Sequence, residues 1–132
     1  MLSMGRLSRG LLYFRLIREL LRYDLIEAIA GFRGIRRGFR PGEFNRESTS
    51  LELEAEVCDA LNRCIPFYWK LVPCLQRSVV TVRVLRIYGA HAEVVIGYRL
   101  APFMAHAWVE AGGRMVNDSP AFQSRLQVLE RL

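Results

Sequence analysis

The sequence has few residues of the kinds that cross-link a small protein. Its 132 residues include only three cysteines, and no two of them form a Cys-x-x-Cys motif. An odd number of cysteines without paired spacing is not typical of a secreted disulfide framework or of a structural zinc site. A chain of this length can bury a core without such links. We therefore expect one domain that folds in a reducing cytoplasm and holds no metal or cofactor.

Long apolar runs are also absent. Arg15, Arg18, Glu19 and Arg22 interrupt the apolar stretch near the N-terminus. These charges argue against a secretory signal and against a membrane span, which requires about 18 consecutive apolar residues. With 52% hydrophobic and 24% charged residues, the composition is that of an ordinary globular protein.

Positive charge is concentrated in the first third of the chain. Residues 1–46 hold ten arginines and four acidic residues, and 10 − 4 accounts for the whole net charge of +6. Residues 47–132 hold nine charges of each sign. We interpret residues 1–46 as a basic amphipathic helical arm and residues 47–132 as the core of a single compact domain. We expect no nucleic-acid partner.

The arm contains a helical pattern over residues 11–30, which Gly31 and Gly34 should end. Its charged residues share one face. The remaining apolar residues form two neighbouring rows, Leu12, Leu16 and Leu20 beside Ile17 and Leu21. Two readings of the charged face stay open: a solvated surface, or a docking face for an acidic peptide, a protein or a membrane surface. Residues 32–50, rich in glycine, proline and polar residues, read as a linker.

A second helix should follow this linker. Thr49 and Glu52 have the spacing of a capping box, and Leu53, Val57 and Leu61 recur as one apolar row. Cys58 lies beside that row, so we interpret it as a core residue. Residues 63–73 contain two prolines and three aromatics, which predicts an irregular but packed connection.

Residues 74–88 are ambiguous by pattern. Four valines favour a strand, whereas the spacing of the apolar residues also fits a helix. In a helix, Pro73 and Cys74 would occupy the first positions and Gly89 the end. A thiol placed there would face unpaired amide groups, which favour the thiolate and could also hold the oxyanion of an acyl intermediate.

A nucleophilic cysteine needs a base, and the sequence offers two histidines. His91 stands at the start of an alternating segment and reads as a surface residue. His106 shares one face of a second strand with Trp108 and Glu110, ahead of a Gly-Gly turn and a return strand. A three-residue loop over 111–113 would pair residues whose numbers sum to 224 and place His106 opposite Asp118, with their Cβ atoms about 5 Å apart. A two-residue loop would shift the partner by one and weaken that geometry.

Four segments together resemble the stand-alone leader peptidase of lasso-peptide biosynthesis, a member of the transglutaminase-like superfamily. They are PCLQRS at 73–78, GAHAEVVIGY at 89–98, AHAWVE at 105–110 and VNDSP at 116–120. The resemblance covers roughly residues 50–130. It implies an α+β fold of the transglutaminase-like or papain-like cysteine peptidase type, with N-terminal helices packed on an antiparallel sheet, and a helix rather than a strand over residues 75–88.

The resemblance also implies a reaction. Cys74 would be the nucleophile, His106 the base and Asp118 the residue that orients it, and together they would remove the leader from a ribosomally made lasso-peptide precursor. The implied partners are the precursor leader peptide, a separate leader-recognition protein and an ATP-dependent cyclase. The Cys74 N–H would be one oxyanion donor. Tyr68 and Trp69 are candidates for the second, although Trp69 reads better as core.

Three other readings stay open. The same triad could form amide bonds as a transglutaminase-like acyltransferase, or the chain could be a non-catalytic peptide-binding subunit in which Cys74 is inert. A Cys64–Cys74 disulfide is a weaker alternative. The spacings between the three cysteines fit no common metal site.

Overall fold

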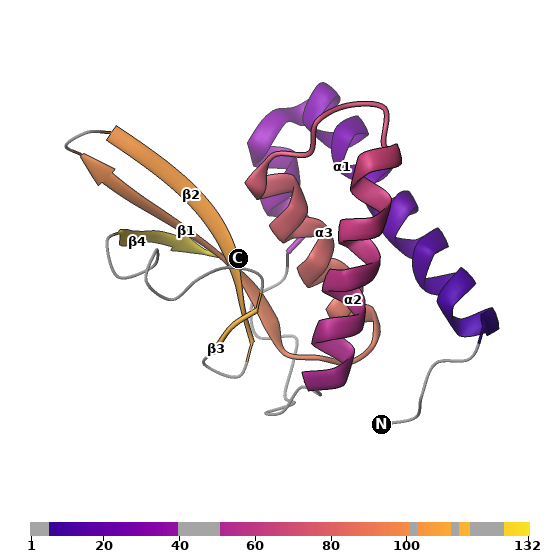
Figure 1. The fold of residues 1–132 in the computed structure, drawn as a ribbon. Coiled ribbons are helices and arrows are strands. Elements are labelled where there is room, and N and C mark those ends of the chain that lie inside the picture. The colour runs from indigo at the N-terminus through magenta and orange to yellow at the C-terminus, as the bar shows by residue number, and fades with distance from the viewer. Residues whose placement is uncertain (1–5, 40–50, 101–102, 112–113, 117–125) are drawn as a thin grey trace.

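The computed structural model describes residues 6–39, 51–100, 103–111, 114–116 and 126–132. Within these ranges, helices stand on one side of a four-stranded sheet (Figure 1). The helices are α1 (Arg6–Arg37), α2 (Leu51–Cys64) and α3 (Cys74–Ile87), with a short 3-10 helix at Ile65–Phe67; the strands are β1 (Ala92–Leu100), β2 (Phe103–Ala111), β3 (Arg114–Met115) and β4 (Gln127–Arg131). This architecture confirms the α+β class.

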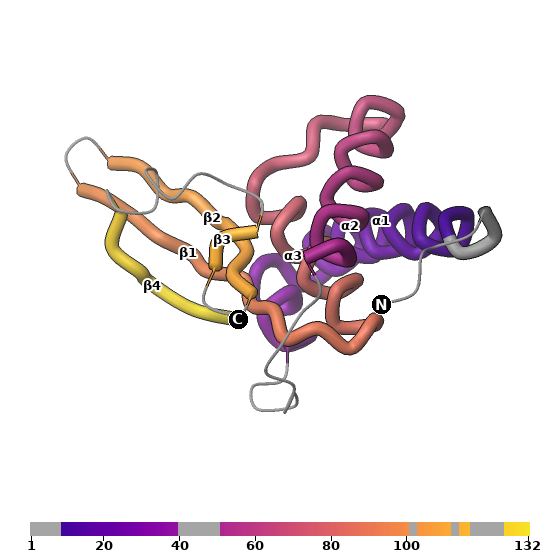
Figure 2. The backbone as a smooth tube through the Cα atoms, turned by 60° about the horizontal axis from the view of Figure 1, so that its bottom comes forward, coloured from indigo at the N-terminus to yellow at the C-terminus, as the bar shows by residue number. Residues whose placement is uncertain are grey.

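The sheet is antiparallel throughout and has the strand order β3-β2-β1-β4. β1 and β2 form a long hairpin whose register runs from Ala92↔Ala111 to Leu100↔Phe103. The helix α3 packs on both of these strands near one end, while the other end of the hairpin projects away from the helices (Figure 2). Leu100 and Phe103 are accordingly exposed.

The helix α3 forms the centre of the core, between α1 and α2 on one side and the sheet on the other. Its buried residues include all four valines. Burial of these valines among the other helices and the sheet outweighs their strand preference, so the expected helix is confirmed. It ends at Gly89, whose φ of 87° is open to glycine, and the Ala90 N–H donates to the Leu85 carbonyl at 3.0 Å.

The element α1 consists of two helical segments. The helical backbone is interrupted at Gly31, where φ is 63° and ψ is −159°, so the expected end at Gly31 is confirmed; a second helical segment follows, includes Gly34 and ends at Arg37. The continuation has a packing reason, because it carries Ile35, and just beyond it Phe39, back into the core. A side chain at Gly34 would collide with the turn before the kink.

The faces of α1 also differ from the expectation. Leu12, Leu16 and Leu20 are buried as expected, but Ile17 and Leu21 are exposed. Glu19, which the pattern places on the charged surface, is only 2% exposed and accepts a hydrogen bond from Arg83 Nε at 2.7 Å. A buried carboxylate requires such a partner, and the arginine that provides it lies 64 residues away in the sequence.

The helix α2 buries Leu53, Val57 and Leu61, as expected. The possible cap Thr49 lies outside the described residues. The connection to α3 is only partly packed: Tyr68 and Val72 contact the core, but Phe67, Trp69 and Leu71 are between 71% and 93% exposed. The interpretation of Trp69 as a core residue is therefore wrong, because Tyr68 and Val72 rather than Trp69 attach this segment to the core.

Candidate active site

Cys74 is the first residue of α3, and its side chain is half-buried at the edge of the core. The residue before it, Pro73, is extended and supplies no side-chain cap, and the first turn holds no acidic residue. The Arg77 N–H donates to the Pro73 carbonyl at 3.0 Å and closes the first turn. The earlier amides of this turn, including that of Cys74, have no partner within the helix. The sulfur therefore lies beside the positive end of the helix dipole.

Gln76 fixes the first turn of α3 against α1. Its side chain is fully buried, and its Nε2 donates to the Leu20 carbonyl at 3.1 Å. Its Oε1 accepts a hydrogen bond from Lys70 Nζ at 2.6 Å. Both ends of the amide are thus satisfied by groups outside α3, so the position of Cys74 depends on α1 and on the connection.

Asp24 of α1 extends this polar network. Lys70 Nζ lies 3.1 Å from Asp24 Oδ1, and the Tyr68 hydroxyl donates to Asp24 Oδ2. Burial and then the hydrogen bond to Asp24 raise the pKa of Tyr68 to about 12, so its phenol stays protonated at neutral pH. We call Asp24, Tyr68, Lys70 and Gln76 the α3 clamp.

Tyr23 of α1 is a neighbour of Cys74 that sequence reasoning missed. Burial raises its pKa above the ordinary value, a hydrogen bond to Glu27 adds to the shift, and the charges of Glu27, Asp24 and Cys74 contribute further. The only signal in the sequence is its position on the buried row, three residues after Leu20.

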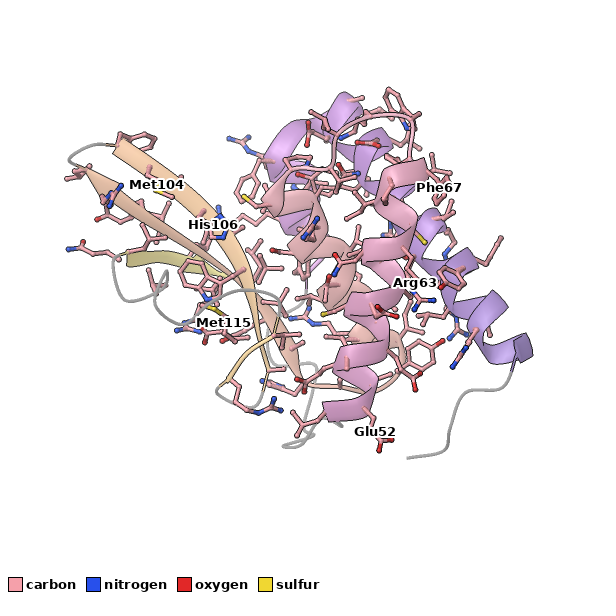
Figure 3. All side chains as sticks on the ribbon, in the orientation of Figure 1. Glu52, Arg63, Phe67, Met104, His106 and Met115 are labelled. Atoms are coloured by element: carbon pink, nitrogen blue, oxygen red, sulfur yellow. The ribbon has the colours of Figure 1, made fainter. Side chains whose placement is uncertain are left out.

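His106 lies midway along β2 and is labelled in Figure 3. Its cross-strand partner is Gly97, and its ring stacks on Trp108 with centroids 6.2 Å apart. Trp108 is fully buried and occupies the space over Gly97: a Cβ at that glycine would lie 2.6 Å from the indole. Gly97 is therefore needed for the close approach of the ring on which the imidazole rests.

A charged network continues along the same face. Trp108 Nε1 donates to Glu110 at 2.9 Å, and Arg131 joins Glu110 at 2.9 Å to Glu93 at 2.7 Å. The expectation that His106, Trp108 and Glu110 share a face is consistent with this arrangement, because side chains two apart in a strand point to the same side.

That shared face is not the one on which α3 packs. Ala107, Val109 and Ala111 of β2 belong to the main core cluster under the helices. His106 alternates with them and so points to the opposite face of the sheet. Among the described residues, β3 pairs only with the Glu110–Ala111 end of β2. The outer edge of β2 at His106 carries no strand within the part of the chain described.

The third candidate, Asp118, lies outside the described residues. The register that leads toward it is visible: Glu110 pairs with Met115 and Ala111 with Arg114, so the paired numbers sum to 225. Of the two registers considered from the sequence, the observed one is therefore that of the two-residue loop, and the register with a sum of 224 is not formed.

The other cysteines and His91 show no comparable setting. All three cysteines are free, so Cys64 and Cys74 form no disulfide. Burial raises the pKa of Cys58 to about 11, with Glu54 adding to the shift, and burial also raises the pKa of Cys64. Both thiols are thus held in the unreactive protonated form. His91 is exposed just before β1.

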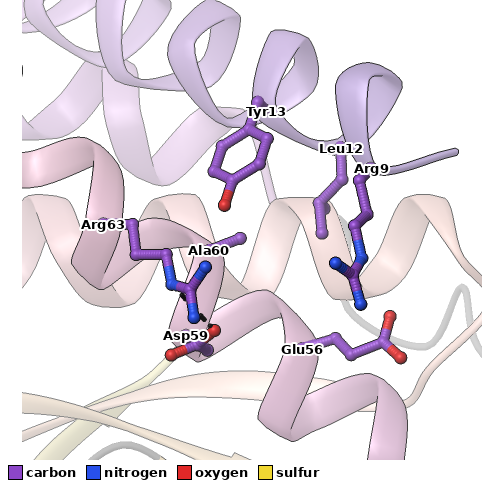
Figure 4. A pocket seen from close by; sticks show the side chains of 7 residues that line it. All are labelled: Arg9, Leu12, Tyr13, Glu56, Asp59, Ala60 and Arg63. Carbon is purple, nitrogen blue, oxygen red and sulfur yellow. Dashed lines mark ion pairs between the residues drawn. The ribbon is translucent and has the colours of Figure 1, made fainter. Parts of the chain in front are cut away.

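A pocket of about 90 Å³ lies elsewhere, between the start of α1 and α2 (Figure 4). Arg9 and Tyr13 line it from α1, and Glu56, Asp59 and Arg63 line it from α2, with Asp59 and Arg63 ion-paired at 3.2 Å. Tyr13 and Asp24 are eleven residues apart on one helix, which corresponds to roughly 16 Å. The pocket therefore belongs to another part of the surface than the α3 clamp.

Comparison with models of known protein families identifies the family of this chain. Residues 18–131 match the family model described as Transglutaminase-like superfamily. The chain belongs to the transglutaminase-like superfamily. Among curated proteins, this transglutaminase-like chain is similar to the Microcin J25-processing protein McjB of Escherichia coli, with 39% identity over 59 residues. That match covers 45% of this chain and only 28% of McjB. No solved structure matches the chain.

The family assignment covers Cys74 and His106 as well as most of α1. The apolar row of α1 that enters the core is thus partly inside the family region. No helix in the described part of this transglutaminase-like chain is long and apolar enough to cross a membrane.

Proposed function

We propose that this protein is a cysteine peptidase that removes the leader from a lasso-peptide precursor, with Cys74 as nucleophile, His106 as base and Asp118 as the residue that orients the imidazole. The observation that carries this proposal is the setting of Cys74 in a transglutaminase-like chain, at the uncapped start of a buried helix. A cysteine beside free helix amides has the environment of a reactive thiol. Burial raises the pKa of the other two thiols and disfavours their thiolates, which leaves Cys74 as the candidate.

The printed name of the relative supports the pathway. McjB is a processing protein for microcin J25, and removal of a leader is a processing step. Since the match spans less than a third of McjB, the cut bond and the partners of this chain are proposals in their own right. We propose the precursor leader as substrate, with a separate leader-recognition protein and an ATP-dependent cyclase as partners.

In the proposed reaction His106 takes the Cys74 proton, and the thiolate attacks the carbonyl at the leader boundary. The imidazolium then protonates the leaving amine of the core peptide as the C–N bond breaks. Water, deprotonated by His106, hydrolyses the thioester and releases the leader as a carboxylate. The Cys74 N–H is the oxyanion donor that the geometry supports.

The two residues considered earlier as second donors are less well suited. The Tyr68 hydroxyl already donates a hydrogen bond to Asp24, and the Trp69 side chain interacts with the Tyr68 oxygen. Both belong to the α3 clamp or contact it, so we assign them to positioning of the helix rather than to the oxyanion. Tyr23, whose raised pKa keeps it neutral beside Cys74, adds no competing charge to the site.

The test is mass spectrometry of the precursor after incubation with the recognition protein and this chain. The wild type should yield two fragments from one cut, Cys74→Ala should yield none, and His106→Ala should lose most of the rate. Cys58→Ala is the matched control and should cleave normally, because the raised pKa of its thiol, about 11, keeps it protonated.

Two other results would decide against the proposal. A single product of increased mass that carries an added amine would indicate an amide-forming acyltransferase. Full processing by Cys74→Ala would indicate a non-catalytic peptide-binding subunit in which another component cuts the chain.

A further inference from the structure

The helix α1 is apolar on two opposite faces. One face carries Leu12, Leu16 and Leu20 into the core. The other carries Phe14, Ile17, Leu21, Leu25 and Ile29, whose exposed fractions run from 44% to 77%. At about 100° per residue, the second set is centred roughly opposite to the first. We call these five residues the outer row of α1.

The two edges of the outer row carry different charges. Arg18 and Arg22 follow one edge, and both are exposed. Asp24 lies along the other edge, where it is bound by Tyr68 and Lys70 of the α3 clamp. Positive charge thus borders the apolar row on one side, and on the other side the row meets the connection before Cys74.

That connection continues the apolar surface. Tyr68 and Lys70 bind Asp24, whereas the alternate residues Phe67, Trp69 and Leu71 are 90%, 71% and 93% exposed. Since Asp24 lies along one edge of the outer row, its bonds to Tyr68 and Lys70 attach this exposed segment to α1 at that edge. Leu71 precedes Cys74 by three residues, which is about 10 Å of extended chain.

A surface of this extent indicates a partner. Monomers rarely expose a contiguous apolar patch of more than roughly 300–600 Å², and larger patches mark interaction sites. Eight large apolar side chains, each about half exposed or more, are enough to reach that range. A helix that is apolar on both faces is expected to be covered on both.

The charges indicate which partner fits. A second copy of the chain that packs antiparallel on this face would bring the arginines of two α1 helices together, and like charges oppose that contact. An anionic membrane would favour basic residues along both edges, but Asp24 and the exposed Glu27 lie on the side of the helix away from Arg18 and Arg22. A protein that presents an apolar face with carboxylates along one edge matches the asymmetry.

We propose that the outer row of α1, together with Phe67, Trp69 and Leu71, docks the leader-recognition protein, whose contact face is apolar with an acidic edge opposite Arg18 and Arg22. The identity of this partner rests on the proposed function. The docking surface leads directly to Cys74, so the bound partner delivers the leader boundary to the nucleophile without contacting the catalytic groups.

The test measures the Kd between the full chain and the fluorescently labelled recognition protein by anisotropy. Leu21→Ser/Leu25→Ser should weaken binding about tenfold or more, because exposed leucines at the centre of an interface are removed. Leu100→Ser/Leu129→Ser is the matched control: these leucines are 75% and 66% exposed, lie on the sheet, and should leave the Kd unchanged. Arg18→Glu should weaken binding and reduce its salt dependence.

Three further measurements separate the alternatives. Cys74→Ala should bind with the wild-type Kd but not cleave; if the wild type also fails to cleave while binding still depends on the outer row, the docking surface stands and the proposed function fails. If Leu21→Ser/Leu25→Ser leaves the Kd for the recognition protein unchanged but abolishes dimers in light scattering, the docking proposal is overturned. The same holds if the Kd is unchanged but the variant no longer sediments with phosphatidylglycerol vesicles. An equal loss of affinity in the control variant would overturn it as well.

Discussion

The first turn of α3 and the middle of β2 hold their candidate residues in different ways. Around Cys74, the contacts are polar and come from three separate segments: Asp24 from α1, Tyr68 and Lys70 from the connection, and Gln76 from α3 itself. Around His106, the described support is an aromatic ring packed on a glycine within one hairpin.

This difference predicts how substitutions should affect the two candidate residues. Packing on the sheet contributes to global stability, so a substitution there should both destabilise the whole protein and displace His106. The α3 clamp is built from a few hydrogen bonds at the edge of the core, so damage there should displace Cys74 while most of the fold remains. Three substitutions, taken from the largest expected effect to the smallest, test this contrast.

The largest effect is expected for Trp108→Ala. Removing a fully buried tryptophan should lower the free energy of unfolding by about 3–5 kcal/mol. Urea denaturation followed by circular dichroism measures this change. Trp69→Ala is the matched control and should change stability by less than about 0.5 kcal/mol, because that indole is exposed. Equal losses in the two variants would contradict the packing difference between them.

A smaller loss is expected for Gln76→Leu. Leucine fills much of the space but leaves the buried Leu20 carbonyl without its side-chain donor and removes one of the three partners of Lys70. The free energy of unfolding should fall by about 1–3 kcal/mol. Cleavage should fall further than stability explains, because the first turn of α3 loses its attachment to α1. A variant with reduced stability but wild-type cleavage at a temperature where it is fully folded would show that the clamp does not position Cys74.

The smallest effect concerns pH. Burial and the bond to Asp24 raise the pKa of Tyr68 from 10.0 to about 12. Because the folded pKa is raised, this contribution to stability is complete below pH 10 and is lost as pH rises through about 12. Tyr68→Phe should therefore show a smaller fall in unfolding free energy between pH 10 and 12 than the wild type. Tyr98→Phe, which removes only an exposed bond to Gln127, should follow the wild-type curve.

The same contrast shows what the sequence could predict. Regular spacing identified α2, its buried row and the shared face of His106 and Trp108, because these depend on neighbours within one element. Valine propensity left α3 undecided; the resemblance to a family, rather than the pattern, identified it as a helix. The sequence left two registers open for this hairpin, because the length of the loop at Gly112–Gly113 cannot be read from the two glycines.

Contacts between distant segments were the least predictable. The α3 clamp, the pair of Glu19 with Arg83 and the strand β4 all depend on partners far away in the chain. The sequence pattern identified two residues of the outer row, Ile17 and Leu21, as apolar. A pattern of apolar residues does not tell which of two faces meets the core. The role of Asp118 stays a prediction, because this residue lies outside the described part of the chain.

Lys70 is the only lysine among the 132 residues, and its ammonium group bonds to Asp24, Gln76 and the Leu71 carbonyl. Acylating reagents and lysine-specific proteases can therefore address just one side chain here, and it lies four residues before Cys74. Amine chemistry intended to attach the protein to a sensor surface would modify the clamp itself or else the α-amino group. The same scarcity makes the rate of lysine modification a direct report of how often the clamp opens.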